Sequence, residues 1–199
     1  MLREFARAEA LAREALASAE EHGFAEGTIY TRAVLGLARA ELGHTAEGVA
    51  LLRHALAGAS TDRGSRFRIT VMLTYLAEAQ ALDSKVVDAL RTIDDALRAN
   101  PQELFLRPET LRVRGELRLR QGDSGLAEDD FREAISLAQK MGAKAWELRA
   151  TTSLARLLRQ QGRIAEARDA LAPVYNWFTE GFDTADLKDA AALLRELGA

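Results

Sequence analysis

The chain of 199 residues contains no cysteine, which excludes disulfide bonds and thiolate chemistry and is typical of a reducing compartment. Only 3 residues are proline and only 6% are aromatic, whereas 48% are hydrophobic. A core of that composition must be built largely from alanine and leucine, which suits closely packed helices.

Long apolar runs and an excess of one charge are also missing. No window approaches the roughly 18 to 20 apolar residues of a membrane span, and the N-terminal sequence MLREFARAEALAREAL alternates charge with alanine instead of forming the apolar core of a signal peptide. A net charge of −3 with mixed signs gives no general attraction to nucleic acid or acidic lipid. We therefore expect a cytoplasmic protein that binds no membrane and does not by itself bind nucleic acid.

Sequence motifs for catalysis and metal binding are missing as well. The chain has no GxxxxGKS or GxxxxGKT, no HExxH and no GxSxG, and its three histidines, His22, His44 and His54, lack a matching set of carboxylates. The acidic neighbours Asp94-Asp95 and Glu128-Asp129-Asp130 point to different sides of a helix, so we expect solvated faces rather than an acid and base pair. The sequence thus predicts no enzyme activity, no metal site and no cofactor.

What the chain does contain is a repeated pattern of small residues, clearest in the segment LRVRGELRLRQGDSGLAEDDFREAI at 111–135. Gly115 lies seven residues before Gly122, and Ala127, Phe131 and Ala134 follow Gly122 at offsets of five, nine and twelve. Glycine and alanine at these offsets allow two antiparallel helices to approach closely, with one large ring between them. The pattern predicts a helical hairpin.

The same pattern recurs along the chain. Its other copies are Gly36, Gly43, Gly48, Leu52 and Ala55; Ala77, Ser84, Ala89, Ile93 and Ala96; Ala155, Gly162, Ala167, Leu171 and Val174; and a truncated copy at Ala8, Ala12 and Ala15. The turn positions 43, 84, 122 and 162 are separated by 41, 38 and 40 residues. A fixed period in this range indicates an α-solenoid.

This signature resembles the tetratricopeptide repeat, whose first helix carries a small residue and whose second helix carries alanine, an aromatic residue and alanine after a turn glycine. The family period is about 34 residues, so the helices or connectors here are longer. The resemblance implies an all-α fold: a right-handed solenoid of antiparallel hairpins with a C-terminal capping helix. It also implies that the first helices of the hairpins line a concave groove.

The spacing predicts one domain over residues 1–199, with a half repeat at 1–22, hairpins at about 25–59, 65–99, 108–140 and 143–178, and a cap at 184–197. The half repeat is a second helix without its first. This end therefore either continues into an upstream repeat, in a longer protein, or pairs with a second copy to form a homo-oligomer.

The last repeat holds two local features. Pro173 falls inside its second helix, where we expect the helix to kink or end and Tyr175, Trp177 and Phe178 to turn onto neighbouring helices. Asp183 or Thr184 is expected to cap the final helix. Its buried stripe is predicted as Leu187, Ala190, Ala191 and Leu194, with Lys188, Asp189, Arg195 and Glu196 facing water.

Residues 142–187 also resemble the C-terminal repeat region of large bacterial signalling ATPases, in which a cyclase or DNA-binding domain precedes an NTPase module and helical repeats. The segments that carry this likeness are Trp146-Glu147-Leu148-Arg149, Ser153-Leu154-Ala155-Arg156, Gln161-Gly162, Ala165-Glu166-Ala167 and Trp177 to Thr184. The likeness implies a regulatory or scaffolding part of a signalling protein.

The candidate binding residues lie in the predicted groove. The spacing of Arg149, Thr152, Arg156 and Arg159 places them on one helical face, and Arg112 and Glu116 belong to the inward positions of the preceding hairpin. Such a cluster can hold a carboxylate or phosphate through forked hydrogen bonds. The alternative is that these arginines pair with Glu109, Glu116 and Glu147. Earlier inward positions are mostly apolar: Tyr30, Ala33, Leu37, Val71, Thr74 and Glu78.

Two functional hypotheses remain from the sequence. The first is a non-catalytic module for protein interaction or regulation in signal transduction, in which the groove binds a peptide or partner domain. The second is a small-molecule effector-sensing domain of a transcription regulator.

Overall fold

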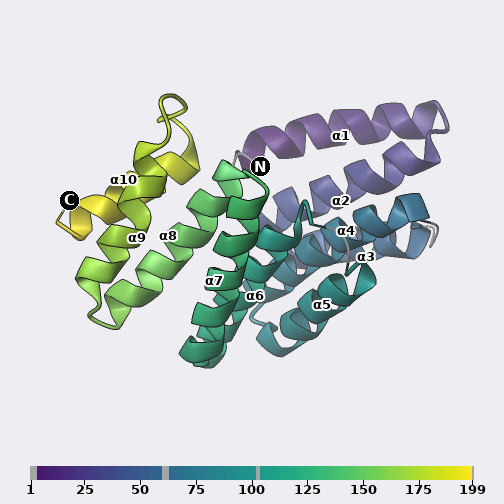
Figure 1. The fold of residues 1–199 in the computed structure, drawn as a ribbon. Coiled ribbons are helices and arrows are strands. Elements are labelled where there is room, and N and C mark those ends of the chain that lie inside the picture. Colours follow the sequence, from purple (N-terminus) through teal and green to yellow (C-terminus); the bar gives the residue numbers. More distant parts are fainter. Residues whose placement is uncertain (1–3, 60–62, 102–103, 199) are drawn as a thin grey trace. The chain divides into compact units, whose positions relative to one another are not determined.

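The computed structural model describes residues 4–59, 63–101 and 104–198, and within these residues all regular structure is helical (Figure 1). The chain divides into two compact units, with the boundary between Glu103 and Leu104. The organisation of 1–199 as one repeat domain stays a prediction. Within the described ranges, every helix falls short of the length and hydropathy required to span a membrane.

The N-terminal unit contains five helices: α1 (Phe5–Glu21), α2 (Ala25–Glu41), α3 (Thr45–Gly58), α4 (Arg63–Leu82) and α5 (Val86–Ala99). Helices α2 and α3 form one hairpin and α4 and α5 the next, while α1 packs against α2. Helix α4 contacts both α2 and α3. Each hairpin therefore stacks on its neighbour through its first helix.

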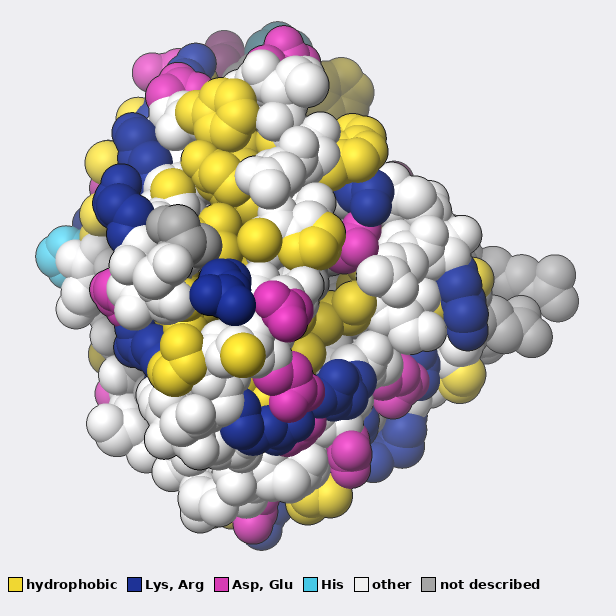
Figure 2. Space-filling view, turned by 60° about the vertical axis from the view of Figure 1, so that its left-hand side comes forward, with side chains coloured by type: hydrophobic (Ala, Val, Ile, Leu, Met, Phe, Trp, Pro, Cys, Tyr) yellow, Lys and Arg dark blue, Asp and Glu magenta, His cyan; other side chains and the backbone are white. Residues whose placement is uncertain are grey.

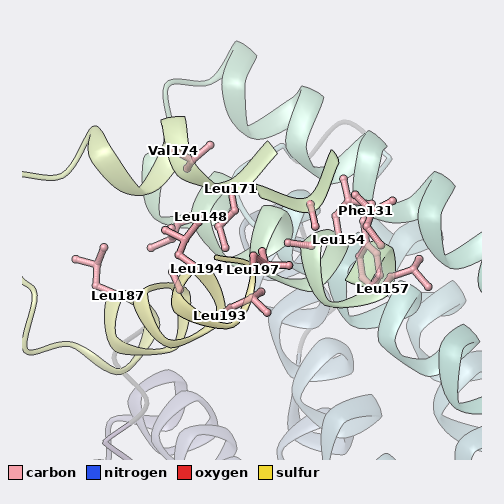
Figure 3. Packing of buried hydrophobic residues seen from close by; sticks show 14 of the residues in the cluster. Phe131, Leu148, Leu154, Leu157, Leu171, Val174, Leu187, Leu193, Leu194 and Leu197 are labelled. Carbon is pink, nitrogen blue, oxygen red and sulfur yellow. The ribbon is translucent and has the colours of Figure 1, made fainter. Parts of the chain in front are cut away.

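The C-terminal unit contains the other five: α6 (Arg107–Gln121), α7 (Ser124–Lys140), α8 (Lys144–Gln160), α9 (Ile164–Asn176) and α10 (Ala185–Glu196). Helix α8 contacts α6, α7 and α9, and α10 contacts α8 and α9. In Figure 3, Leu194 of α10 lies beside Leu148 of α8, and both belong to one buried cluster with Leu187 and Leu193 of α10 and Leu171 of α9. The predicted final helix therefore covers the last hairpin.

The hairpin turns adopt the backbone conformation that the repeat pattern requires. Gly43, Gly122 and Gly162 have φ values of 92°, 92° and 77°, and Ser84, at the equivalent position, has φ of 58°. In each turn the next N–H donates to the carbonyl five residues earlier, as His44 does to Arg39 at 2.9 Å and Asp123 to Arg118 at 2.9 Å. This bond ends the first helix and reverses the chain.

Close helix contact depends on Gly115. A Cβ atom built there lies 2.5 Å from Cε1 of Phe131, a ring that is fully buried between α6 and α7. No side chain larger than hydrogen fits at position 115 unless the ring moves. The predicted pairing of a small residue with one large ring is therefore present in this hairpin.

Some sequence expectations are wrong. Asp130 does not lie on a solvated face: it is buried, and its carboxylate accepts hydrogen bonds from Arg114 at 2.6, 3.0 and 3.1 Å and lies 2.8 Å from Arg118 Nη1. The prediction that Asp130 faces solvent was wrong because two arginines on α6 offset the cost of removing its carboxylate from water. Inward positions of the N-terminal unit are likewise buried in helix contacts instead of lining a groove: Ala33, Leu37, Val71 and Thr74.

The end of the last hairpin also differs from expectation. Helix α9 continues past Pro173 to Asn176, so it does not end at the proline, and the kink stays a prediction. Trp177 is exposed, whereas Tyr175 and Phe178 pack against the buried cluster as expected. Thr184 is the N-cap residue of α10, but its hydroxyl donates to the Gly181 carbonyl at 2.7 Å and forms no capping bond to the helix. The hydroxyl closes the preceding turn instead.

Candidate functional site

The C-terminal unit carries a shallow polar depression between α6, α8 and α10. All of its lining residues are polar or charged: Arg112 from α6, Arg149, Thr152, Ser153 and Arg156 from α8, and Asp186 and Asp189 from α10. We call this the three-helix pocket. Because α8 packs against both other helices, one face of α8 forms the floor of the pocket.

The two hydroxyl groups of the floor are buried and hydrogen-bonded. Thr152 donates to the Leu148 carbonyl at 2.7 Å. Ser153 donates to Oε1 of Glu116 at 2.6 Å, which links α8 to α6. The pocket therefore has a floor whose polar groups are already satisfied within the protein.

Glu109 forms ion pairs with two of the pocket arginines, Arg112 and Arg149. Its buried carboxylate accepts a forked pair of hydrogen bonds from Arg112, at 3.0 and 2.8 Å, and Arg149 Nη2 lies 2.8 Å from Oε1. Burial raises the pKa of Glu109, but attraction to Arg112 and Arg149 outweighs it and holds this pKa below 4.5. Glu109 is thus a buried anion that fixes two guanidinium groups.

The rim of the pocket on α10 is held less tightly. Nε of Arg149 lies 3.8 Å from Asp186, and Nη2 of Arg156 lies 3.5 Å from Asp189. The side chains of Arg156 and Asp189 are 43% and 40% exposed, whereas Arg149 is 13% exposed. A long, half-exposed ion pair contributes little to stability.

The arginines of the pocket already have acidic partners. Its three arginines face four carboxylates, of Glu109, Glu116, Asp186 and Asp189. An isolated carboxylate or phosphate would therefore have to displace an existing acidic partner. Figure 2 likewise shows Lys and Arg side chains lying beside Asp and Glu side chains. The arrangement favours a ligand that carries both signs of charge.

Four of the six predicted site residues line the pocket: Arg112, Arg149, Thr152 and Arg156. Glu116 lies next to it, 3.6 Å from Arg112, and Arg159 instead pairs with Glu196 near the end of α10. The alternative interpretation was that the arginines pair with Glu109, Glu116 and Glu147. Arg112 and Arg149 do pair with Glu109. Glu147 instead pairs with Lys144 at 2.7 Å. The binding role of these six residues stays a prediction.

Three pocket residues are not among the candidates from sequence. Ser153, Asp186 and Asp189 all line it, and Asp189 was expected to face water. The available signal was the spacing of Asp186 and Asp189, which puts two carboxylates on one face of the last helix. This face of α10 lies against α8 because of how α10 packs in the folded unit. The spacing of residues along the chain does not specify that packing.

Aromatic residues lie close to the site. The guanidinium of Arg149 lies 5.6 Å from the ring centroid of Trp146, a cation–π contact, and Lys144 Nζ lies 5.6 Å from that of Trp177. Trp177 and Phe182 are both largely exposed in the connection between α9 and α10. The C-terminal unit thus presents apolar rings as well as the polar pocket.

Within the described residues of the C-terminal unit, no group of acidic or histidine side chains is arranged to hold a metal ion.

Comparison with solved structures shows the fold to which this chain is similar. The chain is similar to BtubC (BKLC) from P. vanneervenii, with a TM-score of 0.73, 15% identity and coverage of 98% of this chain and 90% of that one. It is also similar to a putative kinesin light chain from Podosopora anserina with nearly identical TPR-like repeats, with a TM-score of 0.65, 16% identity and coverage of 84% and 83%. A third similar structure is the MamA protein, with a TM-score of 0.53, 13% identity and coverage of 86% and 92%.

These likenesses confirm the predicted fold class, an all-α solenoid of tetratricopeptide-like hairpins. No protein-family model matches the sequence, and no curated protein matches it. The protein is thus a tetratricopeptide-like repeat protein in fold.

Proposed function

We infer that the protein is a non-catalytic interaction module, and that the three-helix pocket binds a peptide or partner segment carrying both acidic and basic side chains. The observation that carries this proposal is the loose pair between Arg156 and Asp189 at the rim, above a floor that is already bonded. An acidic group of the partner forms an ion pair with Arg156, and a basic group of the partner forms one with Asp189. Both pocket charges then remain compensated throughout binding.

The resemblance of residues 142–187 to the repeat region of bacterial signalling ATPases supports a place in signal transduction, in the cytoplasm. In such a protein the repeats bind a partner or another domain, and catalysis takes place in other domains. The absence of nucleophile, acid and base motifs from the sequence supports a non-enzymatic role.

The test is an array of short peptides of mixed charge, probed with the full chain and with Arg156→Ala plus Asp189→Ala. Loss of two charge-assisted hydrogen bonds should weaken binding about tenfold or more. Arg168→Ala is the matched control, because Arg168 is also 43% exposed and pairs with a neighbouring aspartate, but on α9 outside the pocket. Equal binding by the double variant and the control, or binding by neither the variants nor the unmodified chain, would contradict the proposal.

A second candidate function is recognition of a small polar effector, as in a transcription regulator. The observation in its favour is the lining of the pocket, in which arginine, aspartate and hydroxyl side chains from three helices lie together without apolar residues. Thermal unfolding with a panel of amino acids and other zwitterionic metabolites checks it. A ligand that binds the pocket raises the midpoint with concentration, and this shift is absent from Arg156→Ala.

A further inference from the structure

One aromatic residue stands on the same face of α8 as the pocket arginines. Trp146 precedes Arg149 by three residues and Arg156 by ten, and these spacings place all three on one side of the helix. Trp146 lies in the first turn of α8, and its ring centroid is 5.6 Å from the guanidinium of Arg149, which lines the three-helix pocket. The ring therefore lies beside the end of the pocket at which α8 begins.

The Trp146 ring is partly open to water and is held in place. The next two residues of α8, Glu147 and Leu148, are buried, whereas Trp146 is only partly buried. The guanidinium against which it rests belongs to Arg149, which is 13% exposed and lies 2.8 Å from the buried carboxylate of Glu109. A ligand that covers the ring gains the free energy of removing apolar surface from water. It does not first have to order the arginine beside the ring.

The length of this face indicates the kind of ligand that can use all of it. Trp146 and Arg156 are ten residues apart on α8, which corresponds to a rise of about 15 Å along the helix. An extended peptide advances by about 3.3 Å per residue. About four or five peptide residues therefore connect a side chain on the Trp146 ring with one on Arg156. A single amino acid is too short to reach both.

We propose that Trp146 is an apolar subsite of the three-helix pocket. It binds a large apolar side chain of the partner peptide, four or five residues away from the charged side chains that pair with Arg156 and Asp189. This inference rests on the proposed function, the binding of a peptide of mixed charge, and adds one required side chain to that peptide. The charged rim sets the position of the peptide, and the ring selects among peptides of equal charge.

The experiment compares two sets of extended peptides that carry the same acidic and basic pair. In one set a leucine stands four or five residues before or after the pair, and in the other set alanine replaces that leucine. In calorimetry, the full-length chain should bind the best leucine peptide about tenfold more tightly than its alanine counterpart. Trp146→Ala should bind both peptides with equal affinity, close to that of the unmodified chain for the alanine peptide.

Trp177→Ala is the matched control. Trp177 is the other tryptophan of the chain and also has a cation–π contact of 5.6 Å, with Lys144, but it does not line the pocket. This variant should keep the preference for leucine. Equal binding of both peptide sets by the unmodified chain would overturn the subsite and leave the proposed function standing, whereas binding of neither set would overturn both. A preference that survives in Trp146→Ala would also overturn the subsite.

A second measurement leaves the Trp146 side chain in place, so it does not depend on the folding of Trp146→Ala. Because the chain has two tryptophans, Trp177→Phe makes Trp146 the single source of tryptophan fluorescence. Saturating leucine peptide should shift this emission to shorter wavelength, since it removes the ring from water, and the alanine peptide should shift it less. Identical emission with the two peptides would contradict a contact between the leucine and the ring.

Discussion

Gly115 and Phe131 illustrate how single residues adjust the distance between paired helices. Where the second helix carries the large phenylalanine ring, the first carries glycine, and where the second carries Leu171, the first carries Ala155. All four residues are buried. In these two hairpins a larger residue on one helix faces a smaller one on the other, as an interior packed at crystal density requires, whereas Gly36 faces Leu52 in the first complete hairpin.

The contact between Gly115 and Phe131 makes a stability prediction. Gly115→Ala should destabilise the protein by about 1–3 kcal/mol, because the new Cβ meets the ring of Phe131 at 2.5 Å. Adding Phe131→Leu recreates the combination at Ala155 and Leu171, so the double variant should be more stable than the sum of the single effects by about 0.5–3 kcal/mol. Urea unfolding of the four proteins measures the coupling. Strict additivity would mean that the two residues do not share this contact.

The turn at Ser84 is the one hairpin turn of the repeat pattern that lacks glycine. Its φ of 58° is costly for a residue with a Cβ atom. We predict that Ser84→Gly stabilises the protein by about 1 kcal/mol, after the extra entropy of unfolded glycine is subtracted. The midpoint of thermal unfolding should rise. Gly43→Ser, the reverse change at an equivalent turn, should lower it, and a fall in both variants would contradict the explanation.

At the scale of helices, Glu109 joins α6 to α8 through Arg112 and Arg149. Its lowered pKa means that the folded state binds its proton less readily than the unfolded state. The stabilisation is therefore complete above the ordinary glutamate pKa of about 4.3 and is lost as the pH falls through the lowered value.

Glu109→Gln tests this contribution. At neutral pH the variant should be less stable by about 3–5 kcal/mol, because two largely buried guanidinium groups lose their anion. As the pH falls below the ordinary glutamate pKa of about 4.3, the difference from the unmodified protein should shrink, because the unfolded state then binds a proton that folded Glu109 binds only at lower pH. Urea unfolding across that range measures it. A difference that is constant with pH would show that the charge of Glu109 is not what stabilises the contact.

Helices and their pairing could be predicted well from sequence, because small residues at fixed offsets leave few other arrangements. The positions of Gly43, Ser84, Gly122 and Gly162 specified the turns, and all four have positive φ. Charge pairing could not be predicted in the same way. Asp130 and Asp189 both stand on helix faces that sequence spacing assigns to solvent, and their partners come from another helix.

At the scale of the whole molecule, the pocket depends on contacts that no local pattern contains. Arg149 and Arg156 were placed on one face by their spacing, but the acidic rim that balances them belongs to α10, at least 30 residues further along the chain. An arginine face alone predicts an anion site. With the rim included, the same face predicts a ligand of mixed charge.

The way each hairpin meets its neighbours has a consequence for how such a chain can change in length. Helix α8 touches α6 and α7 in the manner in which α10 touches α8 and α9. Copying the segment from one turn to the next would therefore add a layer whose two outer surfaces already fit those on either side. Gene duplication, or a protein engineer, could lengthen the C-terminal unit by about one period. The three-helix pocket would change its lining, because its residues come from three successive first helices.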